Sequence, residues 1–224
     1  MAGLRQPIET MVNCNNRLVD EAARWVREYF HKMTSAACFF HNYQHTWDTV
    51  VAGSEIAEGM QISADGFETV VIACWFHDIE WFQSSENHEF RSAQTAANFL
   101  EEYGVKKRKI SAVKDCILAT KVPPKPITLL EKIICDADVS HLGMGNYYEK
   151  NLLLRQELEI NLGKTYSDAE WLTMNRDFFR GHRYFTSYAR KMYNEQKSRN
   201  LKTILDLLGK NEVVSPDCGQ IGWT

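Results

Sequence analysis

Apolar residues recur at helical spacing along most of this chain, and no segment shows the sustained alternation of a strand. Glycines and prolines separate the apolar segments, as at Gly59, Gly104, Pro123 and Gly163. The pattern predicts helices at about 16–32, 45–58, 66–76, 87–103, 106–120, 129–142, 147–162, 168–179 and 184–208. We therefore expect an all-α protein.

These helices are expected to form one domain. Neither an internal repeat nor a linker rich in Gly, Ser or Pro divides the 224 residues. Residues 1–209 are predicted to form a single helical bundle, with its core at about 16–205. Residues 210–224 form a short polar segment, which we expect to be an irregular tail.

Composition limits the classes of partner. The net charge is -3 and the basic run at 106–109 is short, so a nucleic-acid polymer is not an expected ligand. No apolar stretch has the length of a membrane span, and the N-terminal segment lacks the apolar run of a signal peptide. The six cysteines form no CxxC pair. We expect a cytoplasmic protein without disulfides and without a membrane partner, and the abundant aromatic residues leave a homodimer open.

A histidine and an aspartate end one strongly apolar helix. The residues at helical spacing on its buried face are Phe67, Val70, Val71, Cys74 and Trp75. His77 and Asp78 follow at the inner end of this face. Buried polar groups of this kind cost free energy unless they are hydrogen-bonded or bind a metal. The pair is therefore a candidate ligand pair, and a structural histidine–carboxylate pair stays open as the alternative.

Two further side chains suit the same site. His45 lies on an inward stripe of its helix, where a structural or capping histidine is the alternative. Asp138 shares a helix face with Ile134 and Leu142, whereas Asp136 points to the opposite face. Asp136 is better interpreted as a supporting group, a solvent-side group or a helix-stabilising acid. Two imidazoles and two carboxylates suit a divalent metal ion and leave positions for water and substrate.

The order of these motifs resembles the HD superfamily of metal-dependent phosphohydrolases, over about residues 16–205. The matching segments read His41-Asn42-Tyr43-Gln44-His45, Phe76-His77-Asp78, Asn87-His88-Glu89-Phe90-Arg91-Ser92-Ala93 and Asp136-Ala137-Asp138-Val139-Ser140-His141-Leu142-Gly143. The resemblance implies an HD-type helical bundle in which His45, His77, Asp78 and Asp138 bind the metal. It also implies hydrolysis of a small phosphorylated substrate.

Two departures from the family pattern narrow the function. Members that hydrolyse alarmones carry a Glu-Asp pair shortly after the His-Asp pair, but residues 79–82 here read Ile-Glu-Trp-Phe. Many two-metal members place further histidines later in the chain, and residues 120–123 contain none. We therefore expect one divalent ion (Mn, Mg, Co, Ni, Fe or Zn) and disfavour alarmone hydrolysis.

Groups around the expected metal suggest roles in phosphoryl transfer. Lys121 ends a helix before a proline-rich turn and is the preferred cation for the phosphoryl oxygens, although a solvated lysine is an equal alternative.

Glu89 flanks the predicted buried stripe of its helix and is the candidate for proton transfer, whereas His88 is expected to be exposed. His41 is expected to orient a water molecule or phosphate, and the resemblance implies that Asp78 both binds the metal and orients its water. Further basic candidates are Arg91, Arg155 and the pair His182-Arg183, which is predicted to open the last helix. The buried stripe is predicted to comprise Phe90, Ala93, Ala97 and Leu100.

The sequence thus predicts a metal-dependent phosphohydrolase that cleaves a phosphoester or phosphoanhydride of a nucleotide or a related small molecule. The main alternative is a non-catalytic or slow regulatory protein of the same fold that binds a nucleotide or a metal. A di-iron oxygenase lacks an obvious set of additional histidine ligands here. A helical interaction module whose polar core residues only hydrogen-bond is the remaining alternative.

Overall fold

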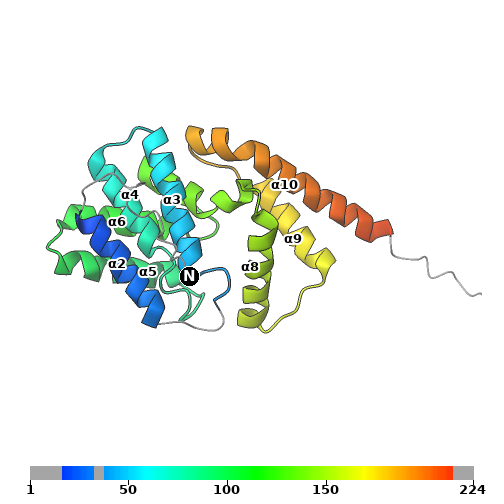
Figure 1. Cartoon of the computed structure of the whole chain (residues 1–224), viewed down its shortest axis with the longest axis horizontal. Helices are drawn as coiled ribbons and strands as arrows, with labels where there is room; N and C mark the ends of the chain where they lie inside the picture. The colour runs from blue at the N-terminus through cyan, green and yellow to red at the C-terminus, as the bar shows by residue number, and fades with distance from the viewer. Residues whose placement is uncertain (1–16, 33–37, 214–224) are drawn as a thin grey trace, which may run out of the picture.

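The computed structural model describes residues 17–32 and 38–213 of the chain, and all regular secondary structure in these ranges is helical (Figure 1). The first six helices are α2 (Arg17–Lys32), α3 (Tyr43–Gly59), α4 (Ala64–Phe76), α5 (His88–Glu102), α6 (Lys107–Ala119) and α7 (Leu129–Asp138). The short 3-10 helix η1 (Ser140–Gly143) leads to α8 (Tyr147–Leu162), α9 (Asp168–Gly181) and α10 (Ser187–Val213). The predicted all-α class is confirmed.

Helix α4 forms the centre of the main bundle. Every residue from Thr69 to Phe76 is buried, which explains why this segment is apolar on all sides rather than on one face. Helices α2, α3, α5, α6 and α7 all pack against it. Because α4 is enclosed, the residues that follow its last turn, His77 and Asp78, emerge inside the protein and not on its surface.

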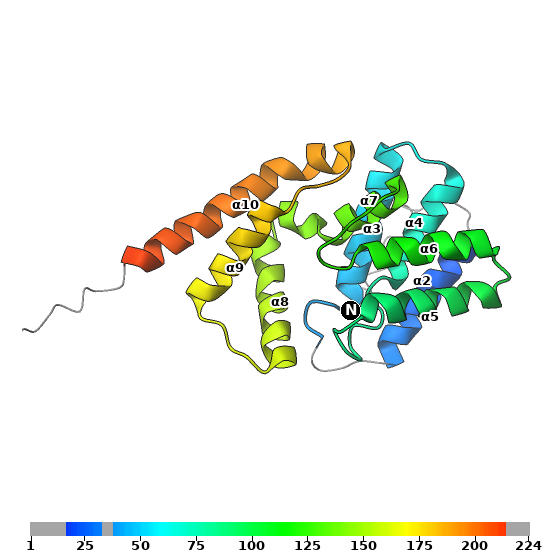
Figure 2. The same cartoon turned by 180° about the vertical axis from the view of Figure 1, so that it is seen from behind.

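Helices α8, α9 and α10 stand beside this bundle as a second group, and the two views agree on the arrangement (Figures 1 and 2). The 3-10 helix η1 joins the groups, and α10 packs across it. The packing is tight at Gly143, where an added Cβ would lie 2.5 Å from the Tyr193 Cβ and 2.6 Å from its backbone oxygen. A glycine is therefore required at this crossing.

Several helix boundaries differ from the predicted ones. Helix α3 begins at Tyr43 because the Asn42 side chain accepts the N–H groups of the first turn. Helix α7 ends at Asp138 instead of continuing to residue 142. Helix α10 begins at Ser187, so the prediction that residues 182–183 open it is wrong.

The end of α10 also differs from the expectation. The helix continues to Val213 and so includes the first residues of the segment predicted to be irregular. Residue 16 of the first predicted helix and residues 214–224 of the predicted tail lie outside the described residues. No helix in the described ranges is long and apolar enough to cross a bilayer.

Candidate metal centre

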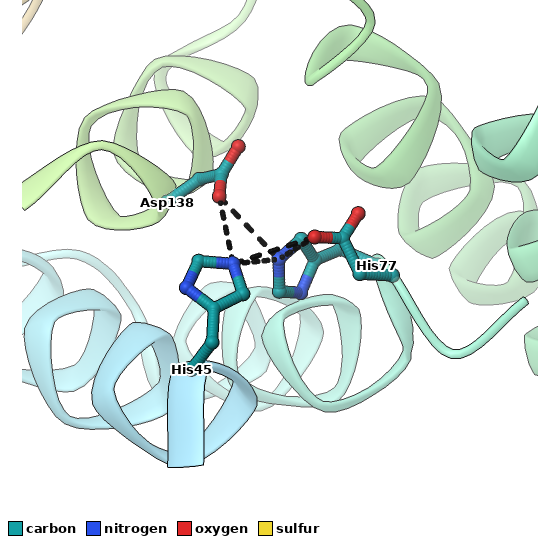
Figure 3. Close-up of side chains that lie close together, drawn as sticks. His45, His77 and Asp138 are labelled. Atoms are coloured by element: carbon teal, nitrogen blue, oxygen red, sulfur yellow. Dashed lines mark hydrogen bonds and ion pairs between the residues drawn. The ribbon is translucent and has the colours of Figure 1, made fainter. Parts of the chain in front are cut away.

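Four side chains from three helix ends converge on one point inside the main bundle. His45 lies in the first turn of α3, His77 and Asp78 follow the last turn of α4, and Asp138 is the last residue of α7. Figure 3 shows the rings of His45 and His77 directed toward the carboxylate of Asp138. One ligand atom from each of the four residues lies within 4.8 Å of the others. The structure thus brings together all four predicted metal ligands.

The distances between these atoms suit a metal ion. The Nε2 atoms of His45 and His77 are 3.2 Å apart. His45 Nε2 lies 3.3 Å from Asp78 Oδ2 and 3.2 Å from Asp138 Oδ1, and the corresponding distances for His77 Nε2 are 3.1 and 3.5 Å. Two ligand atoms about 2.1 Å from a metal are about 3.0 Å apart at a right angle and about 3.4 Å apart at the tetrahedral angle. The four residues therefore fit a divalent ion.

The orientation of His77 is fixed by the end of its own helix. Its Nδ1–H donates to the carbonyl oxygen of Cys74 at 2.8 Å, and the side chain is fully buried. The hydrogen bond selects the tautomer in which Nε2 carries the free electron pair, and a hydrogen bond of this kind commonly orients metal-binding histidines. The ring is thus prepared to bind through Nε2.

The histidines and aspartates of this group shift one another's pKa values. Burial lowers the pKa of His77, but the charge of Asp78 and hydrogen bonds to both aspartates outweigh it and raise that pKa well above its usual value. The pKa of His45 is raised for the same reason, against the effect of burial. Burial would raise the pKa of Asp78, yet the charge of His77 and the hydrogen bonds from the histidines hold it well below its usual range. The carboxylates are therefore ionised at neutral pH, and a bound metal ion would compete with protons for the imidazoles.

His88 belongs to this site, so the expectation that it is exposed is wrong. Its Nε2 lies 3.1 Å from Asp78 Oδ1, the oxygen that does not face the other ligands. Helix α5 begins at His88, after Asn87 in the left-handed conformation (φ +54°), and this start directs the first side chains inward. The buried face is also shifted from the predicted stripe, since Phe90 is 63% exposed.

The other predicted catalytic groups occupy different surroundings. Glu89 is buried, and its Oε2 lies 3.6 Å from His88 Nδ1. Lys121 is exposed, and its Nζ donates to Asn87 Oδ1 at 3.0 Å. The lysine is thus connected to the metal centre through the residue that precedes His88, and it does not contact a predicted ligand directly.

His41 lies before α3 and reaches the centre from its edge. Its Nε2 is 3.9 Å from Asp78 Oδ2, and its ring stacks on Trp81 with centroids 3.7 Å apart. Its Nδ1 contacts the carboxylate of Glu157 on α8, which is fully buried. Neither Trp81 nor Glu157 was predicted to belong to the site, because no motif or periodicity in the sequence marks their contacts with the distant His41.

The remaining basic candidates hold the local fold together. Arg91 donates to backbone carbonyls of the 80–86 loop. Arg155 pairs with acidic side chains at the end of α8 and the start of α9. His182 packs edge-to-face on the ring of Tyr184, ahead of α10. None of these contacts involves a ligand of the metal centre.

Asp136 has a structural role, and the interpretation as a solvent-side group is wrong. Its carboxylate is fully buried and accepts the backbone N–H groups of Phe185 and Thr186, each at 2.7 Å. These bonds fix the segment that leads into α10. Burial raises the pKa of Asp136, and the two backbone donors only partly offset it.

Comparison with solved structures identifies the fold. The chain is 21% identical to a predicted HD superfamily hydrolase from an uncultured Thermotogales bacterium, with a TM-score of 0.56 over 85% of this chain and 91% of the other. YpgQ of Bacillus subtilis, in complex with ADP, is 16% identical, with a TM-score of 0.61 and coverage of 88% and 98%. The Lin1889 protein of Listeria innocua is 15% identical, with a TM-score of 0.60 and coverage of 88% and 97%. No protein-family model and no curated protein matches the sequence.

These likenesses show that the chain has the HD-domain fold, as the sequence motifs predicted. The fold and the converging side chains together define a class: all-α HD-domain proteins with a largely buried group of two histidines and two aspartates that could hold a metal ion.

Proposed function

We propose that this protein is a metal-dependent phosphohydrolase that cleaves a phosphoester or phosphoanhydride of a nucleotide or a related small molecule. The observation that carries the proposal is the convergence of His45, His77, Asp78 and Asp138 at distances that suit one divalent ion. A bound ion would lower the pKa of a water molecule and polarise a phosphoryl oxygen.

The residues of the chain would divide the remaining tasks among them. Asp78 would help to hold the ion, and His88 contacts its Oδ1, so the carboxylate could also orient a water molecule. His41 faces the same centre from the edge and would orient the water or the phosphate. Glu89 would take part in proton transfer near His88, and Lys121 would offset charge on the phosphoryl oxygens from the rim of the site.

The nucleotide part of the proposal has separate support. YpgQ, which shares the fold over most of both chains, was crystallised with ADP. A nucleotide carries the phosphoryl groups on which a divalent ion and a lysine can act. We therefore propose a nucleotide-like small molecule as the substrate. The expectations of a single ion and a cytoplasmic location stay predictions.

Metal analysis followed by a substrate screen tests this function. Purified protein should contain or bind close to one equivalent of divalent metal, and replacing His77 by Ala should remove it. Nucleotides and phosphodiesters are then screened with manganese, magnesium, cobalt and nickel. Asp138→Ala should abolish the hydrolysis found, whereas Asp206→Ala, at an exposed position on α10, should retain it.

The outcomes separate the proposed enzyme from its alternatives. A folded protein that binds no metal contradicts the phosphohydrolase assignment. Metal binding without hydrolysis of any substrate instead favours the slow or non-catalytic regulatory alternative.

A further inference from the structure

Glu157 is a buried acid that the proposed function does not use. It lies on α8, in the group of helices beside the main bundle, and its side chain is fully buried. A buried carboxylate costs several kcal/mol unless its charge is paired and its oxygens accept hydrogen bonds. Its partners therefore indicate what this residue does.

Among the described residues, the hydrogen bonds recorded for this carboxylate are with Phe40 and His41, the two residues that lead to the metal centre. Oε2 accepts the backbone N–H groups of Phe40 at 2.8 Å and of His41 at 3.0 Å. Oε1 contacts Nδ1 of the His41 ring. Burial raises the pKa of Glu157, but the bonds from His41 and from the backbone outweigh it, and the pKa is lowered. The two backbone N–H groups on Oε2 favour the ionised carboxylate, which only accepts hydrogen bonds, so this geometry assigns the proton at the contact to Nδ1 of His41.

The His41 ring also contacts Trp81 and lies close to Asp78. Trp81 stacks on the imidazole with an interplanar angle of 22°. With Nδ1 directed at Glu157, the opposite nitrogen, Nε2, is presented to the metal centre, 3.9 Å from Asp78 Oδ2. A histidine whose tautomer and orientation are set by a carboxylate is the arrangement that many hydrolases use to place an imidazole next to a reacting group.

We propose that Glu157 is a positioning residue that holds His41 with its Nδ1–H toward α8 and its Nε2 toward water or substrate at the metal centre. The role in hydrolysis rests on the proposed function, whereas the positioning does not. Helix α8 thereby becomes part of the site, although all four metal ligands come from the main bundle.

If Glu157 only anchored the backbone, a substitution that keeps the backbone hydrogen bonds would leave the function of His41 unchanged. One oxygen atom is enough to accept the N–H groups of Phe40 and His41. In Glu157→Gln the amide oxygen must face these two donors, so the amide NH2 group faces Nδ1 of His41. Nδ1 must then lose its proton and accept, and the ring changes to the other tautomer. The substitution preserves the shape of the side chain and the hydrogen bonds to the backbone, and it moves the proton of the His41 ring from Nδ1 to Nε2.

The test is the protonation of the His41 nitrogens, measured by long-range 1H–15N NMR on the 15N-labelled full chain at about pH 8, above the usual range of histidine. A His41→Gln variant assigns the signals. Nδ1 should carry the proton in the wild type and lose it in Glu157→Gln. Glu149→Gln, at an exposed position of the same helix, is the matched control and should leave the signals unchanged.

Several outcomes overturn the positioning role. They are an unprotonated Nδ1 in the wild type, a protonated Nδ1 in Glu157→Gln, or an equal change in Glu149→Gln. If Glu157→Gln does not fold, the wild-type spectrum and the Glu157→Asp variant decide the question, because aspartate keeps an acceptor and should keep Nδ1 protonated.

Kinetics on any substrate found then test the consequence for catalysis. Glu157→Gln should lower kcat by about 10- to 100-fold, with a much smaller change in KM and with unchanged metal content. Glu157→Asp should recover part of the loss. An unchanged kcat with an inverted tautomer overturns the catalytic consequence. A wild type without hydrolytic activity contradicts the proposed function alone, since the NMR result stands independently of it.

Discussion

Asp136 and Asp138 are two residues apart and have opposite roles, which a pair of substitutions can separate. Asp136 ties the main bundle to the start of α10, and Asp138 faces the two ligand histidines. Asp136→Ala should therefore destabilise the fold and leave metal binding nearly intact. Asp138→Asn should weaken metal binding and leave the stability of the fold nearly unchanged.

The contacts of Asp136 determine how much Asp136→Ala should destabilise the fold. Its carboxylate accepts two backbone N–H groups at 2.7 Å in a fully buried position, and hydrogen bonds to a charged group contribute about 1.5–3 kcal/mol each. Burial raises the pKa of this carboxyl, so the ionised form is not fully compensated and the lower end of the range applies. We expect a loss of about 3 kcal/mol, which corresponds to a decrease in Tm of about 6–12 °C for a protein of this size.

Urea unfolding in the presence of a chelator measures the loss of stability in Asp136→Ala. Isothermal titration with Mn²⁺ measures the loss of metal affinity in Asp138→Asn. Asp138→Asn should weaken metal binding by at least about 100-fold, the upper end of the cost of losing an outer-shell partner. Asp136→Ala should change it by less than about 10-fold. Loss of metal binding in Asp136→Ala with normal binding in Asp138→Asn would refute the assignment of the two aspartates.

Three further predictions follow from the same geometry. His88→Ala should weaken metal binding by about 10- to 100-fold, because it removes the group that holds the second oxygen of Asp78; titration of the folded variant tests this, and an unchanged affinity contradicts it. Gly143→Ala should destabilise the fold by about 1–3 kcal/mol in urea unfolding because its Cβ would overlap Tyr193, whereas Gly145→Ala has open space around its Cβ and should change stability by less than about 0.5 kcal/mol. Metal affinity should rise with pH through the raised pKa values of the ligand histidines and fall as they are protonated, so titrations at about pH 6 should show weaker binding than those at about pH 8.

Local sequence patterns carried much of the information about this fold. The apolar residues at helical spacing in the 66–76 segment predicted a buried helix with His77 and Asp78 at its inner end, and α4 is enclosed from Thr69 to Phe76. Helical periodicity also distinguished Asp138 from Asp136, because residues two apart on a helix point in nearly opposite directions. These inferences hold since they depend on geometry within one helix.

Predictions that depended on the start of a helix were less reliable. The stripe predicted for α5 included Phe90, which is 63% exposed, and excluded His88, which is buried. The left-handed conformation of Asn87 sets where this helix begins, and so which side chains of its first turn face the metal centre. A periodic pattern of apolar residues does not report such a cap.

The sequence by itself determined the all-helical class, the central apolar helix and the four residues that converge on the candidate metal centre. Only the tertiary structure decided which other groups reach that centre. Glu157 contacts His41 across 116 positions of the chain, and Lys121 is held by Asn87 at the rim. The physical reason is that periodicity records which face of a helix is buried, whereas contacts between distant helices depend on how those faces pack.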